Sequence, residues 1–481
     1  MHEIKKVTQN TGVIIFGNIL DTLCNFLISV SLARYFGQSG FGKLSFLATF
    51  FFFLGSVDNQ WIRPVLIREM TRDEGRSASI AGNGLIIKGL ISIVAIILFW
   101  LTIWLLKPPT EIITLAFFTS IGLLMASITS SYEIILQIKL KMFYSVFSNL
   151  LSKLLTILVI YIIFLSKGRL FHFYLLALIP GIILLLQTKH YSERIIKPKF
   201  EIDFGLWHKI FKESWPLGLT CFFIFIYHRL DQIILFHLQG PDKVGLYSAA
   251  TRLAESFSIV PIALMSSILP LMSQYYELSR KDFERVYQLS FKYLLVFIVP
   301  VSGYISIFSE DIVTFFYGRG FLSSGLTLSI LIWAEVFAFL GIVNNSILIA
   351  SGKQRIDPIF TGTSALVNII LNLILIPRYS FIGAAIASLI AYSVGPIMGY
   401  FIPLTREYSY RMFYFSLKPF FASLAMVCFI ILTRKNPLLS MTLSPFVYLL
   451  VLYYLKGINQ QDIHIIKSIV LTQDEHLSVL R

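Results

Sequence analysis

The sequence predicts an all-α polytopic membrane protein with about fourteen transmembrane helices, in two pseudo-symmetric lobes of six helices plus two C-terminal helices. Hydrophobic residues make up 56% of the 481 residues and charged residues only 14%, with a mean hydropathy of +0.76. Soluble domains carry about 25% charged residues, so lipid must surround most of this surface. Apolar runs of roughly 20 residues, the length that crosses a bilayer, recur along the chain. A glycine pattern repeats in the two halves.

The predicted elements follow in chain order. The first six spans are Gly12 to Arg34, Leu44 to Ile67, Asn83 to Leu106, Glu111 to Leu136, Phe143 to Leu165 and Phe171 to Thr188. A polar stretch, 189–215, predicts a cytoplasmic linker that ends in an interfacial helix. The next six spans are Pro216 to His237, Leu246 to Leu271, Gln288 to Phe308, Ser324 to Ile349, Pro358 to Pro377 and Phe381 to Ile402. The last two are Tyr414 to Thr433 and Pro437 to Lys456. The predicted units are therefore an N-terminal lobe (1–188), the linker (189–215), a C-terminal lobe (216–402) and a final segment (403–481).

The internal repeat appears where the first two spans of each half join. At a constant offset of 203 positions, the aligned residues are Gly37, Gly42 and Ser45 with Gly240, Gly245 and Ser248. Each set marks a tight turn, because glycine adopts backbone angles that other residues resist. Repeats related by an axis along the membrane normal are a transporter architecture. The pattern therefore favours two equivalent lobes.

The formal net charge of +14 follows from the loops. With the N-terminus in the cytoplasm, most of the 40 Lys and Arg residues fall in cytoplasmic connections, as the positive-inside rule requires. This distribution predicts cytoplasmic termini, and it explains the basic surface without a nucleic-acid partner. The three cysteines lie inside apolar spans and indicate neither a disulfide nor a metal site.

Several short phrases resemble one transporter family. They are L-A-R-Y-F-G-Q-S-G-F-G-K-L-S (32–45), I-R-E (67–69), E-S-W-P-L (213–217), R-L-D-Q (229–232), V-G-L-Y-S-A-A-T-R-L (244–253), F-Y-G-R-G-F (316–321), A-S-G-K (350–353), N-x-x-L-N-L-x-L-I-P (368–377) and G-A-A (383–385). In this order and spacing the chain resembles the Wzx-type flippases, the polysaccharide-transporter branch of the MOP exporter superfamily, which also contains lipid II flippases and MATE drug exporters.

This resemblance implies a function as well as a fold. Two lobes would surround a central cavity lined by the first, second, seventh and eighth spans. The cargo would be an undecaprenyl-diphosphate-linked oligosaccharide, a unit of O-antigen or a related surface polysaccharide. It would move from the cytoplasmic to the periplasmic leaflet of a bacterial inner membrane. The implied partners are the lipid-linked glycan, membrane lipid and polysaccharide polymerase or assembly proteins.

Five basic residues lie inside predicted spans and are the candidate diphosphate contacts: Arg229, Lys153, Arg63, Arg252 and Lys88. Charge in the bilayer core costs at least about 2.5 kcal/mol per residue, so such groups face a cavity or a partner. Arg229 and Lys153 lie in mid-span, whereas the other three are close enough to an interface to snorkel instead. Arginine also forms paired hydrogen bonds with phosphate, and we expect the order Arg63, Arg229, Arg252 outwards. For Arg229 and Lys153 the alternative is a structural ion pair.

The interior acids and amides form a second candidate set: Asp21, Asp231, Asp58, Glu255, Asn18 and Asn25. The spacing of Asn18, Asp21 and Asn25 puts them on one helical face. Arg252 and Glu255, three residues apart, either neutralise each other or both face the cavity. Arg229 and Asp231 point to different faces, so Asp231 either has another partner or titrates.

Energy must come from an ion gradient or from consumption of the flipped product, because the chain has no P-loop. The cofactor prediction is therefore none, with H⁺ or Na⁺ as the coupling ion. Asp21 and Asp231 are the predicted coupling carboxylates, since a semi-buried carboxyl beside a cation can change charge. A permanent structural ion pair is the alternative.

Two other functions fit the composition less well. A membrane glycosyltransferase or polymerase would need a place for chemistry, but the chain has neither an Asp-x-Asp pair nor an H-E-x-x-H motif, and its outer connections are short. We therefore predict that the protein is not an enzyme. A MATE-like drug or metabolite antiporter is the nearer alternative, although that group typically has twelve helices.

Overall fold

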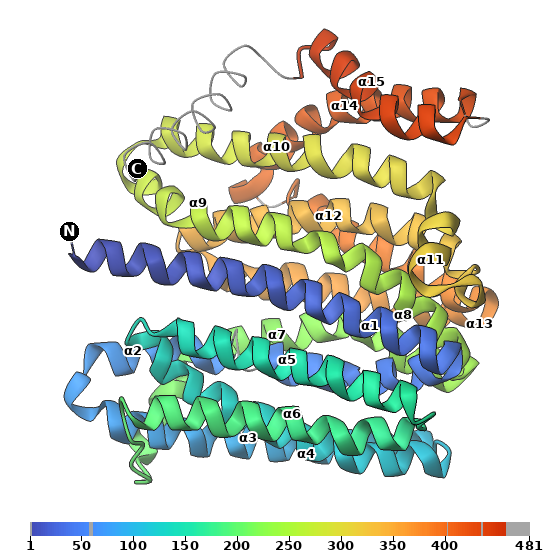
Figure 1. Ribbon diagram of the computed structural model, residues 1–481. Coiled ribbons are helices and arrows are strands. Elements are labelled where there is room, and N and C mark those ends of the chain that lie inside the picture. The colour runs from blue at the N-terminus through green and yellow to red at the C-terminus, as the bar shows by residue number, and fades with distance from the viewer. Residues whose placement is uncertain (1, 57–60, 402, 434–435, 458–481) are drawn as a thin grey trace, which may run out of the picture.

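The computed structural model describes residues 2–56, 61–401, 403–433 and 436–457. Within them the regular structure is helical and forms a bundle of long, roughly parallel rods (Figure 1). The α-helices are α1 (His2–Ser56), α2 (Arg63–Arg72), α3 (Ser77–Leu106), α4 (Thr110–Ile138), α5 (Met142–Leu165), α6 (Leu170–Glu193), α7 (Phe204–Gln239), α8 (Pro241–Glu255), α9 (Ile259–Leu278), α10 (Arg280–Ile307), α11 (Ser309–Tyr317), α12 (Ser324–Ala350), α13 (Asp357–Met398), α14 (Pro403–Leu432) and α15 (Pro437–Tyr454). Short 3₁₀ turns are η2 (Glu74–Arg76), η3 (Ser256–Ser258), η4 (Arg319–Phe321) and η5 (Gln354–Ile356).

The predicted multi-pass helical fold is confirmed. Eleven helical stretches of the described chain are long and apolar enough to cross a membrane. Two of them are long enough to cross twice and bend on the way, α1 at Gly37 and α13 at Ser380, where φ is 67° and 54°. Together with α15, whose apolar part is shorter, they account for the fourteen predicted crossings. Large apolar side chains remain exposed over the outside of the bundle, as expected where lipid is the solvent.

Three predicted elements have different boundaries. The predicted second span falls on α1, described to Ser56, and on α2, which begins at Arg63 next to Pro64, and residues 57–60 between them lie outside the described residues. The eighth span is divided by η3 between α8 and α9. By contrast, the interfacial helix and the seventh span form one helix, α7, which continues through Pro216. Proline in a membrane helix is tolerated when neighbouring groups satisfy the freed carbonyl.

The two halves meet along α1 and α8. In Figure 1, α2 to α6 form the lower part of the bundle, and α9, α10 and α12 the upper part. Helix α1 packs along α5 in its own half and along α8 in the other, while α7 packs along α13. The final helices α14 and α15 pack on α10, where the Tyr448 hydroxyl donates to the Val296 carbonyl at 2.9 Å.

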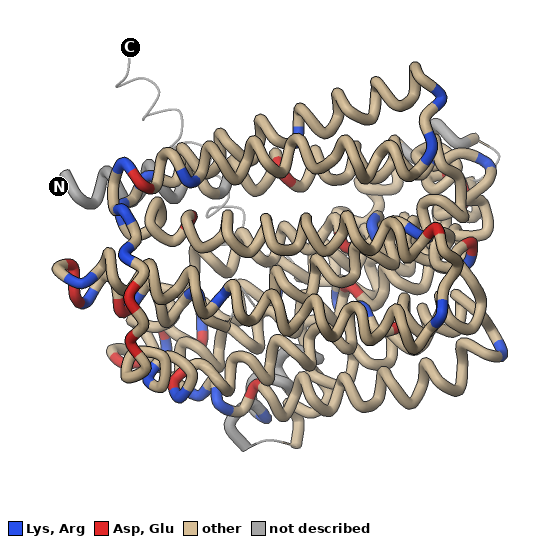
Figure 2. Tube along the Cα trace, turned by 90° about the horizontal axis from the view of Figure 1, so that it is seen from below, with Lys and Arg blue, Asp and Glu red and all other residues tan. Residues whose placement is uncertain are grey.

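The two ends of the bundle differ. One end, called the linker end here, holds α2 and the connection from α6 to α7, and Lys and Arg are dense there (Figure 2). The other, called the turn end, holds the bend in α1 and the junction of α7 with α8. There Gly37 (φ 67°, ψ −170°) and Gly240 (φ 81°, ψ 176°) adopt nearly the same left-handed conformation. These matching angles at equivalent positions are the structural counterpart of the sequence repeat.

The repeated glycines also allow the two halves to pack closely at the turn end. Gly42 lies so close to α8 that a Cβ there would be 1.8 Å from the Pro241 carbonyl oxygen. A Cβ on Gly245 would be 2.1 Å from the Gln38 carbonyl oxygen. Gln38 and Pro241 are themselves equivalent positions of the repeat, so the contact is reciprocal. Only glycine permits so close an approach of two backbones.

Candidate functional site

The strongest ion pair of the second half lies inside the helical bundle. Arg229 on α7 forms two parallel contacts with Glu255 at the end of α8, Nη1 to Oε1 and Nη2 to Oε2, both 2.9 Å. The guanidinium carbon is 4.4 Å from the centre of the Phe52 ring, so the cation also stacks on an aromatic face from α1. Arg229 is only 6% exposed. The structure therefore shows Arg229 in an ion pair, which is the alternative predicted for it.

Arg252 has a different environment. It lies on α8 and is exposed, and it makes neither a hydrogen bond nor an ion pair with any residue that the structure describes. Glu255 forms its bidentate ion pair with Arg229 rather than with Arg252, and Arg252 interacts with Glu255 only electrostatically. Arg252 thus lies about one helical turn from the Arg229–Glu255 pair.

Asp231 is buried and held by neutral donors. The Tyr247 hydroxyl and the Gln232 backbone N–H donate to its carboxylate, the latter at 2.7 Å, and the Ser388 hydroxyl lies 3.4 Å away. Its side chain forms no ion pair within the described residues. The expectation that Asp231 faces away from Arg229 and has another partner is consistent with this arrangement. A third buried acid, Glu335, accepts a hydrogen bond from Ser258 at 2.7 Å.

In the first half, Asp21 and Lys153 form a polar cluster between α1 and α5. Lys153 Nζ lies 3.5 Å from Asp21 Oδ1 and donates to Asn25 Oδ1 at 2.6 Å. The Asn25 amide in turn donates to Asp21 Oδ2 at 2.7 Å. Asn18 lies further along α1 and is exposed. The polar face predicted on the first span is therefore real, and Lys153 is its partner.

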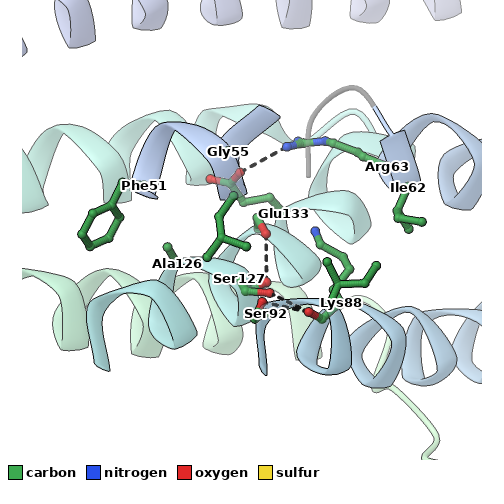
Figure 3. A pocket seen from close by; sticks show the side chains of 12 residues that line it. Phe51, Gly55, Ile62, Arg63, Lys88, Ser92, Ala126, Ser127 and Glu133 are labelled. Atoms are coloured by element: carbon green, nitrogen blue, oxygen red, sulfur yellow. Dashed lines mark hydrogen bonds and ion pairs between the residues drawn. The ribbon is translucent and has the colours of Figure 1, made fainter. Parts of the chain in front are cut away.

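Arg63 and Lys88 line a separate pocket. It has a volume of about 180 Å³ and lies between α1, α2, α3 and α4. Figure 3 shows the two basic side chains entering it from different helices. Arg63 donates from Nε to Gln137 Oε1 at 3.0 Å, and its Nη1 is 3.5 Å from Glu133 Oε2. Lys88 is buried, so both residues face the protein interior rather than the interface.

The candidate cations thus occupy three places rather than one path. Arg63 and Lys88 share the pocket, Lys153 pairs with Asp21, and Arg229 lies beside Arg252. The pocket lining contains only the first two of the five. Asp58 lies outside the described residues.

Sequence reasoning missed an ion-pair network at the linker end. The buried Glu69 on α2 accepts hydrogen bonds from Lys209 on α7 and from its neighbour Arg68, which also pairs with Glu213. The hydrogen bond from Lys209 is the main cause of a Glu69 pKa below the ordinary value of 4.5. The sequence held a signal for this network, because the I-R-E and E-S-W-P-L phrases contain three of its four residues, Arg68, Glu69 and Glu213.

The connection before α7 is fixed to the same end. The carboxylate of Asp203 caps α7 by accepting from the Leu206 backbone N–H at 2.9 Å, and this contact is the main cause of its lowered pKa. Arg76 also pairs with Asp203 at 2.8 Å. A Cβ on Gly82 of α3 would lie 1.8 Å from the Lys199 carbonyl oxygen. The start of α7 is therefore anchored on the first half.

Comparison with known proteins gives family, relatives and fold. A family model described as "Polysaccharide biosynthesis protein" matches residues 7–276, and one described as "MatE" matches residues 216–374. The chain is 25% identical to the "Probable low-salt glycan biosynthesis flippase Agl15" of Haloferax volcanii over 36% of this chain and 37% of the relative. It is 24% identical to a "Putative O-antigen transporter" of Shigella flexneri, over 33% and 37%. The alignments thus span little more than a third of these relatives.

A solved structure is similar over nearly the whole chain. It is titled "Lipid II flippase MurJ, inward closed conformation" and superposes with a TM-score of 0.70 at 19% identity, covering 93% of this chain and 98% of the other. At this identity the likeness concerns the fold alone.

Proposed function

Because the chain belongs to the polysaccharide biosynthesis protein family, we propose that it is a flippase that moves a lipid-linked glycan across the membrane. The observation that carries the proposal is Arg252, an exposed cation with no partner among the described residues, on a helix at the junction of the halves. A charge in this position is costly unless it faces water or an anion. The planar guanidinium matches a phosphate group with paired hydrogen bonds.

The neighbouring ion pair supports this role. Glu255 lies three residues from Arg252 and would cancel its charge if its oxygens were free. Arg229 forms the bidentate contact with Glu255, so the hydrogen-bond donors of the Arg252 guanidinium are available to a ligand. Arg229 thus acts by positioning Glu255, and Arg252 is the proposed phosphate contact.

The finer parts of the proposal concern the cargo and its direction. The cargo is an undecaprenyl-diphosphate-linked oligosaccharide, carried from the cytoplasmic to the periplasmic leaflet of the inner membrane, with both termini in the cytoplasm. The similarity to a probable glycan biosynthesis flippase and to a putative O-antigen transporter supports this cargo class. A polysaccharide polymerase would then be the downstream partner.

Coupling to H⁺ or Na⁺ is proposed at Asp21 and Asp231. The Asp21 cluster supports it best, because a proton or sodium ion on Asp21 would release Lys153 from its ion pair. The freed ammonium would then be available to the glycan or its phosphate. Asp231 is held by hydroxyl donors, so a change in its charge would act on Tyr247 instead.

The test uses purified protein in vesicles that contain undecaprenyl-diphosphate-linked glycan with a fluorophore on the sugar. A membrane-impermeant quencher reports the fraction in the outer leaflet over time. Arg252→Gln should slow flipping roughly tenfold, because a charge-assisted hydrogen bond contributes about 1.5 kcal/mol or more. Lys243→Gln removes the same charge from the turn end of α8 and should flip normally. Equal rates for Arg252→Gln and wild type would contradict the proposal.

An antiporter of drugs or metabolites is the second candidate, because the MatE model matches residues 216–374. The same vesicles separate the two functions. Gradient-driven uptake of a cationic dye, together with no movement of the labelled glycan, would favour the antiporter.

A further inference from the structure

A short helix of the second half reaches across to the first half at the turn end. This helix, α11, packs against both α1 and α8 there (Figure 1). Arg34 of α1 donates from Nε to the Phe316 carbonyl at 2.5 Å and from Nη2 to the Phe315 carbonyl. Both carbonyls belong to the last turn of α11, where carbonyls lack a partner within the helix, so the guanidinium caps that end. The first half therefore holds the C-terminal end of α11 in place.

Tyr317, the last residue of α11, is packed between aromatic rings and has its hydroxyl inside the protein. Its ring centre lies 6.1 Å from that of Phe41 on α1 and 5.5 Å from that of Phe321, and the residue is only 2% exposed. The hydroxyl faces that of Ser29 on α1, and neither has a further hydrogen-bond partner in the described part of the chain. Two facing hydroxyls use only one O–H donor between them, so the other donor is left without an acceptor.

An unused donor inside the protein indicates a missing acceptor. A buried polar group without a hydrogen bond destabilises a fold, so one that persists calls for an explanation. Arg252 of α8 is close enough to Tyr317 for the two to interact electrostatically. The charged groups that act on Arg252 are Arg229 and Glu255, which form an ion pair with each other. The positive charge of Arg252 is therefore in excess beside the hydroxyls, and this combination matches an anion that accepts hydrogen bonds.

We propose that Ser29 and Tyr317 complete the phosphate subsite of Arg252, each as a hydroxyl donor to the diphosphate of the lipid-linked cargo. This inference rests on the proposed function and adds two residues to its site. A diphosphate carries two adjacent anionic groups, so one can accept from the guanidinium while the other accepts from the hydroxyls. The bound anion then supplies the acceptor that the hydroxyls lack. Because the three residues lie on α1, α8 and α11, both halves take part in the site.

The experiment measures binding of radiolabelled undecaprenyl diphosphate, without sugar, to full-length protein in phosphatidylcholine nanodiscs. Tyr317→Phe and Ser29→Ala should each weaken binding at least about tenfold, because each removes a hydrogen bond to a charged acceptor. Two matched controls remove the same groups elsewhere and should bind normally. Tyr161→Phe changes a tyrosine that is 59% exposed, and Ser148→Ala removes a buried hydroxyl that also has no hydrogen-bond partner among the described residues.

Competition identifies the source of the phosphate. Undecaprenol lacks an anionic group and should not displace the diphosphate from wild type. A phospholipid phosphodiester has a single anionic group, so phosphatidylglycerol should displace it only weakly. Competition by phosphatidylglycerol as strong as that by unlabelled undecaprenyl diphosphate would overturn the proposal and show that the site takes a bulk lipid headgroup.

Thermal unfolding without ligand separates a binding role of the hydroxyls from a structural one. If they serve only a ligand, Tyr317→Phe removes an unsatisfied buried group and should unfold at the wild-type temperature or above. Undecaprenyl diphosphate should then stabilise wild type more than it stabilises Tyr317→Phe. A fall in unfolding temperature without ligand would overturn the proposal, as would unchanged affinity in both Tyr317→Phe and Ser29→Ala.

The flipping assay separates this inference from the proposed function. If wild type flips the labelled glycan and both Tyr317→Phe and Ser29→Ala flip it at the same rate, the inference fails while the function stands. If wild type flips nothing but binding of undecaprenyl diphosphate depends on both hydroxyls, the proposed function fails and the anion site stands.

Discussion

Replacing Gly42 by alanine should open the contact between the halves at the turn end. The new Cβ would lie 1.8 Å from the Pro241 carbonyl oxygen, a backbone atom that no rotamer change can move. An ordinary contact between carbon and oxygen is about 3.3 Å or longer, so the two backbones must separate by about 1.5 Å. In Gly245→Ala the new Cβ would clash in the same way with the Gln38 carbonyl oxygen. Either substitution therefore acts on the same interface of α1 and α8.

The size of the effect follows from the cost of overpacking, about 1 to 3 kcal/mol. If the protein alternates between arrangements closed and open at this end, the closed one loses a factor of about 5 to 150 in population. The double variant should cost little more than either single one, because one separation relieves both clashes. Gly89→Ala, on a helix with open space around the position, should be neutral or stabilising.

The assay measures the distance between spin labels placed beside Gly37 and Gly240, in protein whose native cysteines are replaced. Wild type and Gly89→Ala should give mainly the short distance, and Gly42→Ala should move population to a longer one. Flipping should slow in Gly42→Ala and not in Gly89→Ala. An unchanged distance distribution in Gly42→Ala would refute the reasoning, as would simple additivity in the double variant.

Three further predictions follow from the ion pairs. Glu255→Ala leaves Arg229 buried without its partner and should destabilise the protein by about 3 to 5 kcal/mol, whereas adding Arg229→Met should recover most of that loss in thermal unfolding. Glu69 has a lower pKa in the folded protein than its ordinary value of 4.5, so its contact with Lys209 stabilises the fold above pH 4.5, and this stabilisation is lost as the pH falls through the folded pKa. Glu69→Gln should therefore unfold at a lower temperature than wild type at neutral pH. The difference in unfolding temperature between the two proteins should become smaller in acid. Asp21→Asn mimics the protonated acid and should yield stable protein whose flipping no longer responds to an imposed H⁺ or Na⁺ gradient; unchanged gradient dependence would exclude Asp21 as the coupling group.

The membrane crossings could be predicted because each depends on a local property, an apolar run of sufficient length. Helix breaks are less visible in such runs. The turn η3 falls within a stretch that reads as one continuous apolar span. Glycine gave more reliable information at the turn end, because a left-handed φ at Gly37 and Gly240 is a requirement of the backbone itself.

The sequence indicates a pairing of charges only where both partners lie on one helix, whereas the bidentate ion pair of Glu255 joins two helices. The spacing of three residues made Arg252 its nearest candidate in the sequence, but a cation on another helix forms the better bidentate contact. Helix packing decides this choice, because α7 places the buried Arg229 against both Phe52 and Glu255. The two arginines therefore exchange places in the order of candidate phosphate contacts that the sequence predicts. The mid-span arginine that the sequence favours as a diphosphate contact forms an ion pair, so the proposed function assigns the phosphate contact to the arginine nearer the end of its helix.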